Sequence, residues 1–262
     1  MKKALLVAVM AAVLTLAACG GAAETDGNVL RIGVDDAYPP MEFRNDADEL
    51  VGFDVDFAHA LGEELGMEVE FIPTAWDGIF TALVSGSYDV VISSVSITPD
   101  RMAEYDMTDP YLANGQVIVV RSDAQDITDP SGLAGKTVGV QIETTSHASA
   151  RKYQEEFDFQ LDSYDQIIQT FMDLKADRLD AIVVDGMVAA EYISSDPGSY
   201  RVTSAKLSNE PIGVCLKKGA NPELLENLNN AIATLRENGR LAEISMEWLG
   251  ADYTTEIDST LW

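Results

Sequence analysis

The sequence predicts an α/β protein of two doubly wound lobes, whose sheets are mixed but mainly parallel. From residue 29 onward, short runs rich in β-branched residues alternate with helical stretches, and this alternation is typical of parallel sheets. The same alternation starts again near residue 136. The 262 residues, 47% of them hydrophobic, provide enough chain and apolar surface for two domains.

The first unit runs strand, helix, strand, helix, strand. The pattern predicts strands at 30–34, 69–72 and 89–92 and helices at 54–65 and 76–85. Asp54 is the expected N-cap of the first helix, because a short acidic side chain there accepts a hydrogen bond from a free backbone N–H. Thr98 followed by Pro99 predicts a further helix start, since threonine caps helices and proline suits the first helical position.

The second unit repeats this order. Strands are expected at 136–140, 159–162 and 180–184, and helices at 146–157 and 166–176. A strand at 212–216 and helices at 222–237 and 241–249 follow, and they are too few to found a third sheet. We therefore expect this tail to complete the first lobe. Residues 29–112 and 212–262 would then form one lobe and residues 113–211 the other.

Residues 1–18 predict a signal peptide for export. Two lysines follow the first methionine, an apolar run continues to Leu16, and small residues precede Cys19. A cysteine at this point resembles the bacterial lipobox, in which it becomes the lipid-modified first residue of the mature protein. We expect an extracytoplasmic protein, lipid-anchored to the cell membrane, with residues 19–28 as a flexible tether. The alternative is an ordinary cleaved signal with an incidental cysteine.

The formal net charge of −27 excludes nucleic acid as a partner, because phosphate binding needs a basic surface. Such acidity is typical either of a salt-rich habitat or of ordinary acidic exported proteins. Only Cys19 and Cys215 are present, so no disulfide framework is expected. The sequence contains no familiar metal, nucleotide or nucleophile motif, and we expect a monomer without metal or cofactor.

Arg101 lies in the first turn of the helix expected after Thr98. A cation in this place opposes the helix dipole, at a cost of about 0.3–1 kcal/mol. Free backbone N–H groups, serine hydroxyls and a guanidinium together form a receptor for a carboxylate. The alternative is a surface ion pair between Arg101 and Glu104 or Asp106.

Asp185 follows the strand expected at 180–184 and precedes a helix. Ligands of parallel sheets bind beyond the carboxyl ends of strands, so an acid here is suited to hold an ammonium group. Tyr38, Phe43 and Trp76 are aromatic residues near turns and helix starts of the first lobe. They either line the space around a ligand side chain or belong to the ordinary core.

Six short motifs occur in a fixed order along the chain: Tyr38-Pro39-Pro40-Met41-Glu42-Phe43, Gly52-Phe53-Asp54-Val55-Asp56, Trp76-Asp77-Gly78-Ile79, Ser94 to Arg101, Thr144-Thr145, and Leu179 to Gly186. The chain resembles the polar amino acid-binding proteins of ABC importers, and the match runs in order over essentially all of residues 28–250. These proteins belong to solute-binding protein family 3 and have the type II periplasmic-binding fold. The resemblance implies two lobes joined by two crossover strands, closing around a free amino acid that is delivered to an ABC permease.

The resemblance also implies roles for single residues. Arg101 would bind the α-carboxylate of the ligand, and Asp185 would pair with its α-ammonium group. Ser94, Ser96 and Thr145, from the Thr144-Thr145 pair, would add hydrogen bonds. The side chain of the ligand would lie among a further set of residues: Tyr38 and Trp76 as flanking aromatics, Asp35 as a partner for a cationic side chain, and Ser93 and Gln141 as parts of the wall.

Glu143 departs from the family pattern, which usually has glycine before the threonine pair. An acid there either points into the cleft and favours a basic amino acid, or points to solvent. The charges near the cleft favour a basic side chain slightly over a neutral polar one. The departure Met41, where phenylalanine is usual, is a tolerable change of volume.

Two other functions fit the same resemblance. One is a periplasmic dehydratase acting on a prephenate-like substrate, because fold does not decide function. His59 and His147 lie far apart in the sequence and are not expected to act as bases. Glu143 is the one candidate for the acid that a dehydratase needs in its cleft. The other is the ligand-sensing subunit of a signalling receptor, which would need a separate membrane protein. We expect a receptor for transport and no enzyme.

Overall fold

The structure, a computed structural model, describes residues 29–258. The predicted signal peptide at 1–18, Cys19 and the tether at 19–28 all lie outside the described residues. Within the described range, no helix combines the length and apolar character that crossing a bilayer requires.

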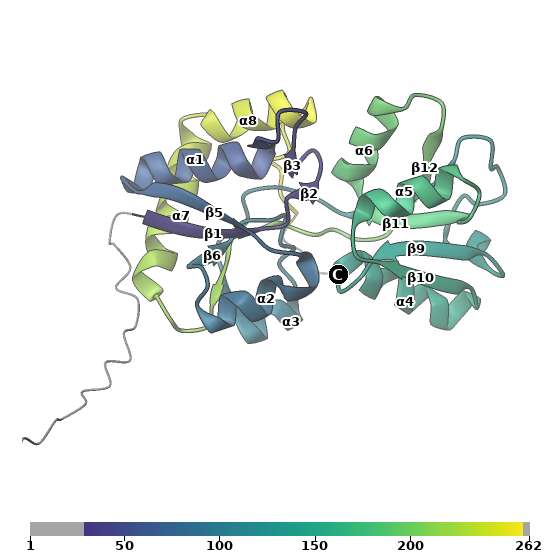
Figure 1. Cartoon of the computed structure of the whole chain (residues 1–262), viewed down its shortest axis with the longest axis horizontal. Coiled ribbons are helices and arrows are strands. Elements are labelled where there is room, and N and C mark those ends of the chain that lie inside the picture. The colour runs from purple at the N-terminus through teal and green to yellow at the C-terminus, as the bar shows by residue number, and fades with distance from the viewer. Residues whose placement is uncertain (1–28, 259–262) are drawn as a thin grey trace, which may run out of the picture.

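The first sheet is mixed and has helices on both faces. Its strand order is β5 (Glu68–Pro73), β1 (Val29–Val34), β6 (Val90–Val91), β13 (Cys215–Lys217) and β7 (Tyr105–Met107). β1 is parallel to β5 and β6, whereas β13 is antiparallel to β6 and β7. Figure 1 shows one face covered by α1 (Phe53–Leu65), α7 (Pro222–Glu237) and α8 (Arg240–Leu249), and the other by α2 (Trp76–Ser85) and α3 (Pro99–Glu104). We call these elements the first lobe.

The second sheet has the same mixture of directions. Its order is β10 (Gln160–Tyr164), β9 (Thr137–Gln141), β11 (Ala181–Asp185), β8 (Gln116–Arg121) and β12 (Tyr200–Lys206). β9 is parallel to β10 and β11, and β8 is antiparallel to β11 and β12. With α4 (Thr145–Phe157), α5 (Ile167–Lys175), α6 (Gly186–Ser195) and the 3-10 turn η1 (Pro130–Leu133), it forms the second lobe. The predicted fold class, two α/β lobes with mixed sheets, is confirmed.

Several short elements differ from the sequence-based expectation. A three-stranded sheet of β2 (Ala37–Tyr38), β3 (Glu42–Arg44) and β4 (Leu50–Val51) was not predicted, because its strands are too short to show a period. The strand expected at 212–216 begins only at Cys215. Ile212 instead forms isolated bridges with Ser96 and Leu112.

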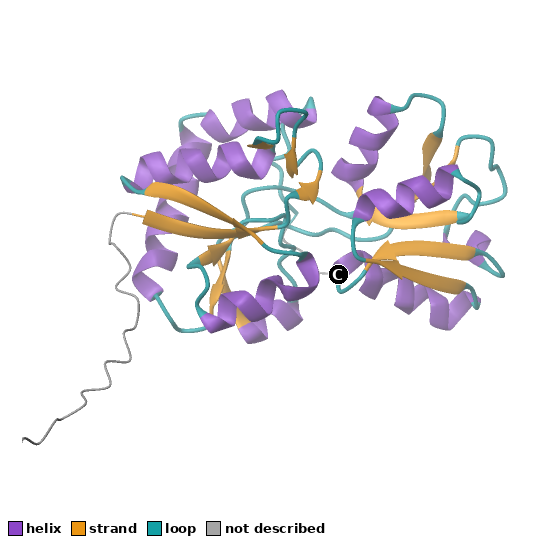
Figure 2. Cartoon of the chain, viewed as in Figure 1, coloured by secondary structure: helices purple, strands orange, loops and turns teal. Residues whose placement is uncertain are grey.

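Two crossover segments, residues 108–115 and 207–214, connect the sheets. Figure 2 shows them as loops that run between the lobes. The predicted lobe boundaries, after residues 112 and 211, fall within these segments. The bridge between Leu112 and Ile212 ties the two crossovers together, so they form a paired hinge rather than two independent linkers.

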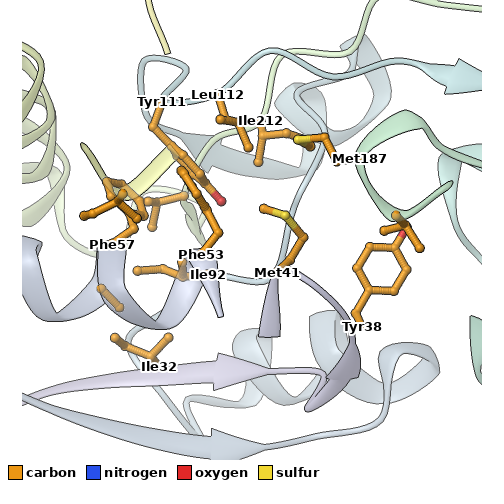
Figure 3. Close-up of a cluster of buried hydrophobic side chains, with 14 of the residues drawn as sticks. Ile32, Tyr38, Met41, Phe53, Phe57, Ile92, Tyr111, Leu112, Met187 and Ile212 are labelled. Atoms are coloured by element: carbon orange, nitrogen blue, oxygen red, sulfur yellow. The ribbon is translucent and has the colours of Figure 1, made fainter. Parts of the chain in front are cut away.

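The main core extends from the first lobe to the hinge. The rings of Phe53 and Phe57, both from α1, stack with Tyr111, and the ring centroids of Phe57 and Tyr111 lie 4.1 Å apart. In Figure 3 the cluster continues past Met41 towards Met187 of the second lobe. The two lobes are therefore joined by apolar packing in addition to the crossover segments of the chain.

The start of α1 does not follow the predicted cap. The N-cap is Gly52 rather than Asp54, and its φ of 135° lies in a region that favours glycine. A Cβ added to Gly52 would lie 2.3 Å from the carbonyl oxygen of Met41. The expected start of α3 is confirmed, because the Thr98 side chain accepts a hydrogen bond from the Arg101 N–H at 3.1 Å.

Gly52→Ala should lower the free energy of unfolding by about 1–3 kcal/mol, because it combines a strained φ with a backbone clash. Urea unfolding measures the difference. Gly78→Ala is the matched control, since Gly78 lies in α2 and a Cβ there meets nothing within 4 Å. Helix propensity should make this control neutral or more stable by up to about 1 kcal/mol. Equal destabilisation by both substitutions would contradict the argument.

Candidate functional site

A cavity with an empty volume of about 330 Å³ lies between the lobes. All the predicted site residues except Glu143 line it, and Glu42 and Ser146 line it as well. The lining residues are Asp35, Tyr38, Glu42, Trp76, Ser93, Ser94, Ser96, Arg101, Gln141, Thr144, Thr145, Ser146 and Asp185. Most follow the carboxyl ends of β1, β6, β9 and β11, where parallel sheets bind their ligands.

Arg101 is held in the cavity without an acidic partner. Its Nη1 donates a hydrogen bond to the carbonyl oxygen of Ser96 at 3.0 Å. Its guanidinium carbon lies 5.4 Å and 5.1 Å from the ring centroids of Trp76 and Phe80. Among residues 29–258, no carboxylate lies within ion-pair distance of this guanidinium. The surface pairing considered above does not form, and burial lowers the pKa of Arg101 from its ordinary value.

Asp185 lies at the end of β11 and accepts hydrogen bonds from neutral donors. These are the Tyr38 hydroxyl at 2.6 Å, Asn114 Nδ2 at 2.7 Å and Gln116 Nε2 at 2.5 Å. Burial, followed by the charge of Glu210, raises the pKa of Asp185 to about 6. At neutral pH the group is a carboxylate, and no cationic side chain of the described chain pairs with it.

Asp35 is a second buried acid of the cavity, with 5% of its surface exposed. Its Oδ2 accepts a hydrogen bond from Gln141 Nε2 of the second lobe at 3.0 Å, and its backbone N–H donates to Ser93 Oγ. Burial is the main reason that the pKa of Asp35 is raised to about 6. A ligand cation beside Asp35 would therefore stabilise its charged form.

The turn that carries Ser93 and Ser94 is held by two buried carboxyl groups. Ser93 Oγ donates to Glu42 Oε1 at 2.7 Å, and the Ser94 N–H donates to Asp54 Oδ2 at 2.6 Å. Ser94 has a φ of 48°, unusual for a residue with a side chain, so these bonds hold a strained turn. Burial and the neighbouring charge of Asp54 raise the pKa of Glu42 well above its usual range, which favours the neutral acid.

Glu143 lies outside the cavity, because its side chain is exposed to solvent. Its φ of 59° lies in the left-handed region, which explains why glycine suits this position. Its backbone carbonyl accepts a hydrogen bond from Trp76 Nε1 at 3.2 Å. Of the two alternatives for Glu143, the structure has the one that points to solvent.

Four hydrogen bonds cross from lobe to lobe at the cavity. Ser96 Oγ and Thr145 Oγ1 share one of them at 3.4 Å. Tyr38 donates to Asp185, Gln141 donates to Asp35, and Trp76 donates to the carbonyl of Glu143. The lobes are therefore closed on each other. Within residues 29–258, the arrangement places one cation and two carboxylates without ion-pair partners around one cavity, which suits a small zwitterion.

Sequence reasoning missed Glu42 and two residues behind the cavity, Gln116 and Glu210. Glu42 lies within a motif that was recognised, but no spacing rule marks its side chain as buried. Gln116 and Glu210 belong to the start of β8 and to the second crossover, which were not predicted as elements. Both side chains are completely buried.

The sequence matches a protein family, the bacterial extracellular solute-binding proteins, family 3, over residues 30–251. The L-cystine-binding protein TcyJ of Escherichia coli strain K12 is 36% identical over 226 residues, which cover 86% of this chain and 84% of that protein. The arginine-binding extracellular protein ArtP of Bacillus subtilis strain 168 is 31% identical over 254 residues, covering 95% of this chain and 98% of that protein.

A solved structure of an ancestral arginine-binding protein bound to arginine has a similar fold. It superposes with a TM-score of 0.81 at 37% identity, covering 85% of this chain and 99% of that chain. The family match, the relatives and this fold all span both lobes. The chain therefore belongs to family 3 of the bacterial extracellular solute-binding proteins.

Proposed function

We propose that the protein is an extracytoplasmic receptor that binds one free amino acid between its lobes and delivers it to an ABC permease. The main observation behind this proposal is that one cavity contains two opposite charges, neither of which has an ion-pair partner. Arg101 offers a guanidinium and Asp185 a carboxylate, and neither is neutralised by another side chain of the described residues. The α-carboxylate and α-ammonium groups of an amino acid complement these two charges.

A basic side chain is the favoured specificity. With Asp35 and Asp185 both charged, the cavity lining carries two negative charges against the single positive charge of Arg101. A zwitterion with an additional cation restores neutrality, whereas a neutral polar amino acid leaves Asp35 without a partner. The relatives named for arginine support this preference, and the relative named for L-cystine is the alternative.

The proposal includes the parts of the chain outside the structure. Residues 1–18 would be removed, Cys19 would carry the lipid anchor, and residues 19–28 would be the tether. The protein would act as a monomer and without catalysis. The exposed side chain of Glu143 supports binding over dehydration, because this acid was the candidate proton donor of the enzyme alternative.

Thermal unfolding with each free amino acid tests the proposal, after bound ligand has been removed by partial denaturation and refolding. L-arginine, L-lysine or ornithine should raise the melting temperature of the wild type. Arg101→Ala should abolish that rise, because the ligand carboxylate loses its charged partner. Arg151→Ala, which removes an exposed arginine of α4, is the matched control and should keep it. If only neutral amino acids raise the melting temperature, the preference for a basic ligand is wrong. If no amino acid raises it, the proposed receptor function is wrong.

Asp35→Asn should stabilise the ligand-free protein at pH 7.5 by about 1–3 kcal/mol. The pKa of Asp35, about 6 in the folded state, exceeds its ordinary value, so folding favours the protonated form and loses stability as pH rises through this range. The gain should largely vanish at pH 4, where the folded carboxyl is protonated. Urea unfolding at both pH values checks this, with the exposed Asp46→Asn as control. A gain that does not change with pH would be inconsistent with a buried, titrating carboxyl.

A further inference from the structure

Gln116 and Glu210 lie behind the cavity, one from each connection between the lobes. Gln116 is the first residue of β8, directly after the first crossover, and Glu210 lies within the second. Both side chains are fully buried, yet neither lines the cavity. A buried carboxylate at a hinge is costly unless its contacts compensate for the lost water.

The carboxamide of Gln116 reaches several residues that line the cavity. Its Nε2 lies 2.5 Å from Asp185 Oδ1, 3.0 Å from Glu210 Oε2 and 3.2 Å from Thr145 Oγ1. Its Oε1 accepts a hydrogen bond from Ser146 Oγ at 2.6 Å. Two hydrogens are thus shared among three acceptors, and two of these acceptors are carboxylates.

Glu210 connects the same amide to the first lobe. Its Oε2 accepts a hydrogen bond from Ser96 Oγ at 2.8 Å, and its Oε1 accepts one from Ser208 Oγ at 2.6 Å. Ser96 Oγ in turn lies 3.4 Å from Thr145 Oγ1. One chain of contacts therefore runs from Ser96 through Glu210 and Gln116 to Asp185, across both crossovers.

We propose that Gln116 and Glu210 are positioning residues for the amino acid, which hold Asp185 and Ser96 in place from the hinge. This inference rests on the proposed function. Neither residue touches the ligand volume. Gln116 fixes the orientation of the Asp185 carboxylate by its hydrogen bond, while Glu210 acts on it by charge through the shared amide.

The two residues should act on Asp185 in opposite directions. The charged or titratable groups that face Asp185 are Tyr38 from β2, Arg101 from α3 and Glu210 from the second crossover. The charge of Glu210 raises the pKa of Asp185, whereas the hydrogen bond from Gln116 lowers it. A residue that only filled space would leave the titration of Asp185 unchanged.

Two near-isosteric variants separate these effects. In Glu210→Gln the Asp185 carboxyl should titrate at least about half a pH unit below its wild-type midpoint near 6, because a like charge is gone. In Gln116→Met it should titrate about half a unit higher, because a hydrogen bond to the charged form is gone. Glu226→Gln removes an exposed carboxylate of α7 and should not change the midpoint. Carboxyl carbon NMR of the ligand-free protein measures each midpoint.

The affinity for L-arginine gives an independent readout. The ligand requires charged Asp185, so protonation of this group alone should weaken wild-type binding about tenfold between pH 7.5 and pH 5. The loss should be smaller in Glu210→Gln and larger in Gln116→Met. Asp35 titrates in all the variants alike, so differences between the profiles report Asp185.

Opposite shifts of the Asp185 midpoint in the two variants, with parallel changes in the affinity profiles, would establish the proposal. Unchanged midpoints in folded variants would overturn it, even if both variants bound L-arginine more weakly. Failure of the wild type to bind any amino acid would instead overturn the proposed function. The NMR titration would still decide how Gln116 and Glu210 act on Asp185.

Discussion

Burial of charges that have no opposite charge beside them is the constraint on which the rest of this structure depends. Arg101, Asp35 and Asp185 are held apart by neutral donors and acceptors, and no ion pair within the described residues neutralises them. Such burial is unfavourable, and hydrogen bonds from fixed dipoles offset only part of the cost. The charged groups of the cavity therefore lack counter-charges, and a complementary ligand stabilises the protein by supplying them.

This constraint explains why so much polar structure lies behind the cavity wall. The turn at Ser93 and Ser94 is fixed by Glu42 and Asp54, and Asp185 is fixed by donors from the hinge. A charged group that moved freely would be solvated by water or neutralised by a counter-ion, and it would then bind the ligand less well. Closure matters for the same reason, because the hydrogen bonds from Tyr38 and Gln141 join the two lobes around the charges.

The helices and the parallel strands of the fold could be predicted from the sequence, whereas β8 and β12, the antiparallel strands of the second sheet, and the short strands β2, β3, β4 and β7 could not. α1 and α7 have a clear apolar face, whereas β2 and β4 have two residues each and carry no period. Asp54 illustrates a second limit, because a helix-start acid looks like a cap until a distant partner such as Ser94 is known. The cavity residues were found because they follow strand ends or lie in recognised motifs. Gln116 and Glu210 were missed because their roles arise from pairing across 94 positions of the chain.

The place of β13 in the first sheet has a consequence for the order of folding. β13 follows the second lobe in the sequence, yet it lies between β6 and β7 and is hydrogen-bonded to both. A nascent chain that stops before Cys215 leaves β7 without its partner, and α7 and α8 cannot yet cover α1. The first lobe thus begins the chain but is completed last. During synthesis, the apolar face of α1 therefore stays uncovered until the chain beyond the second lobe has been made.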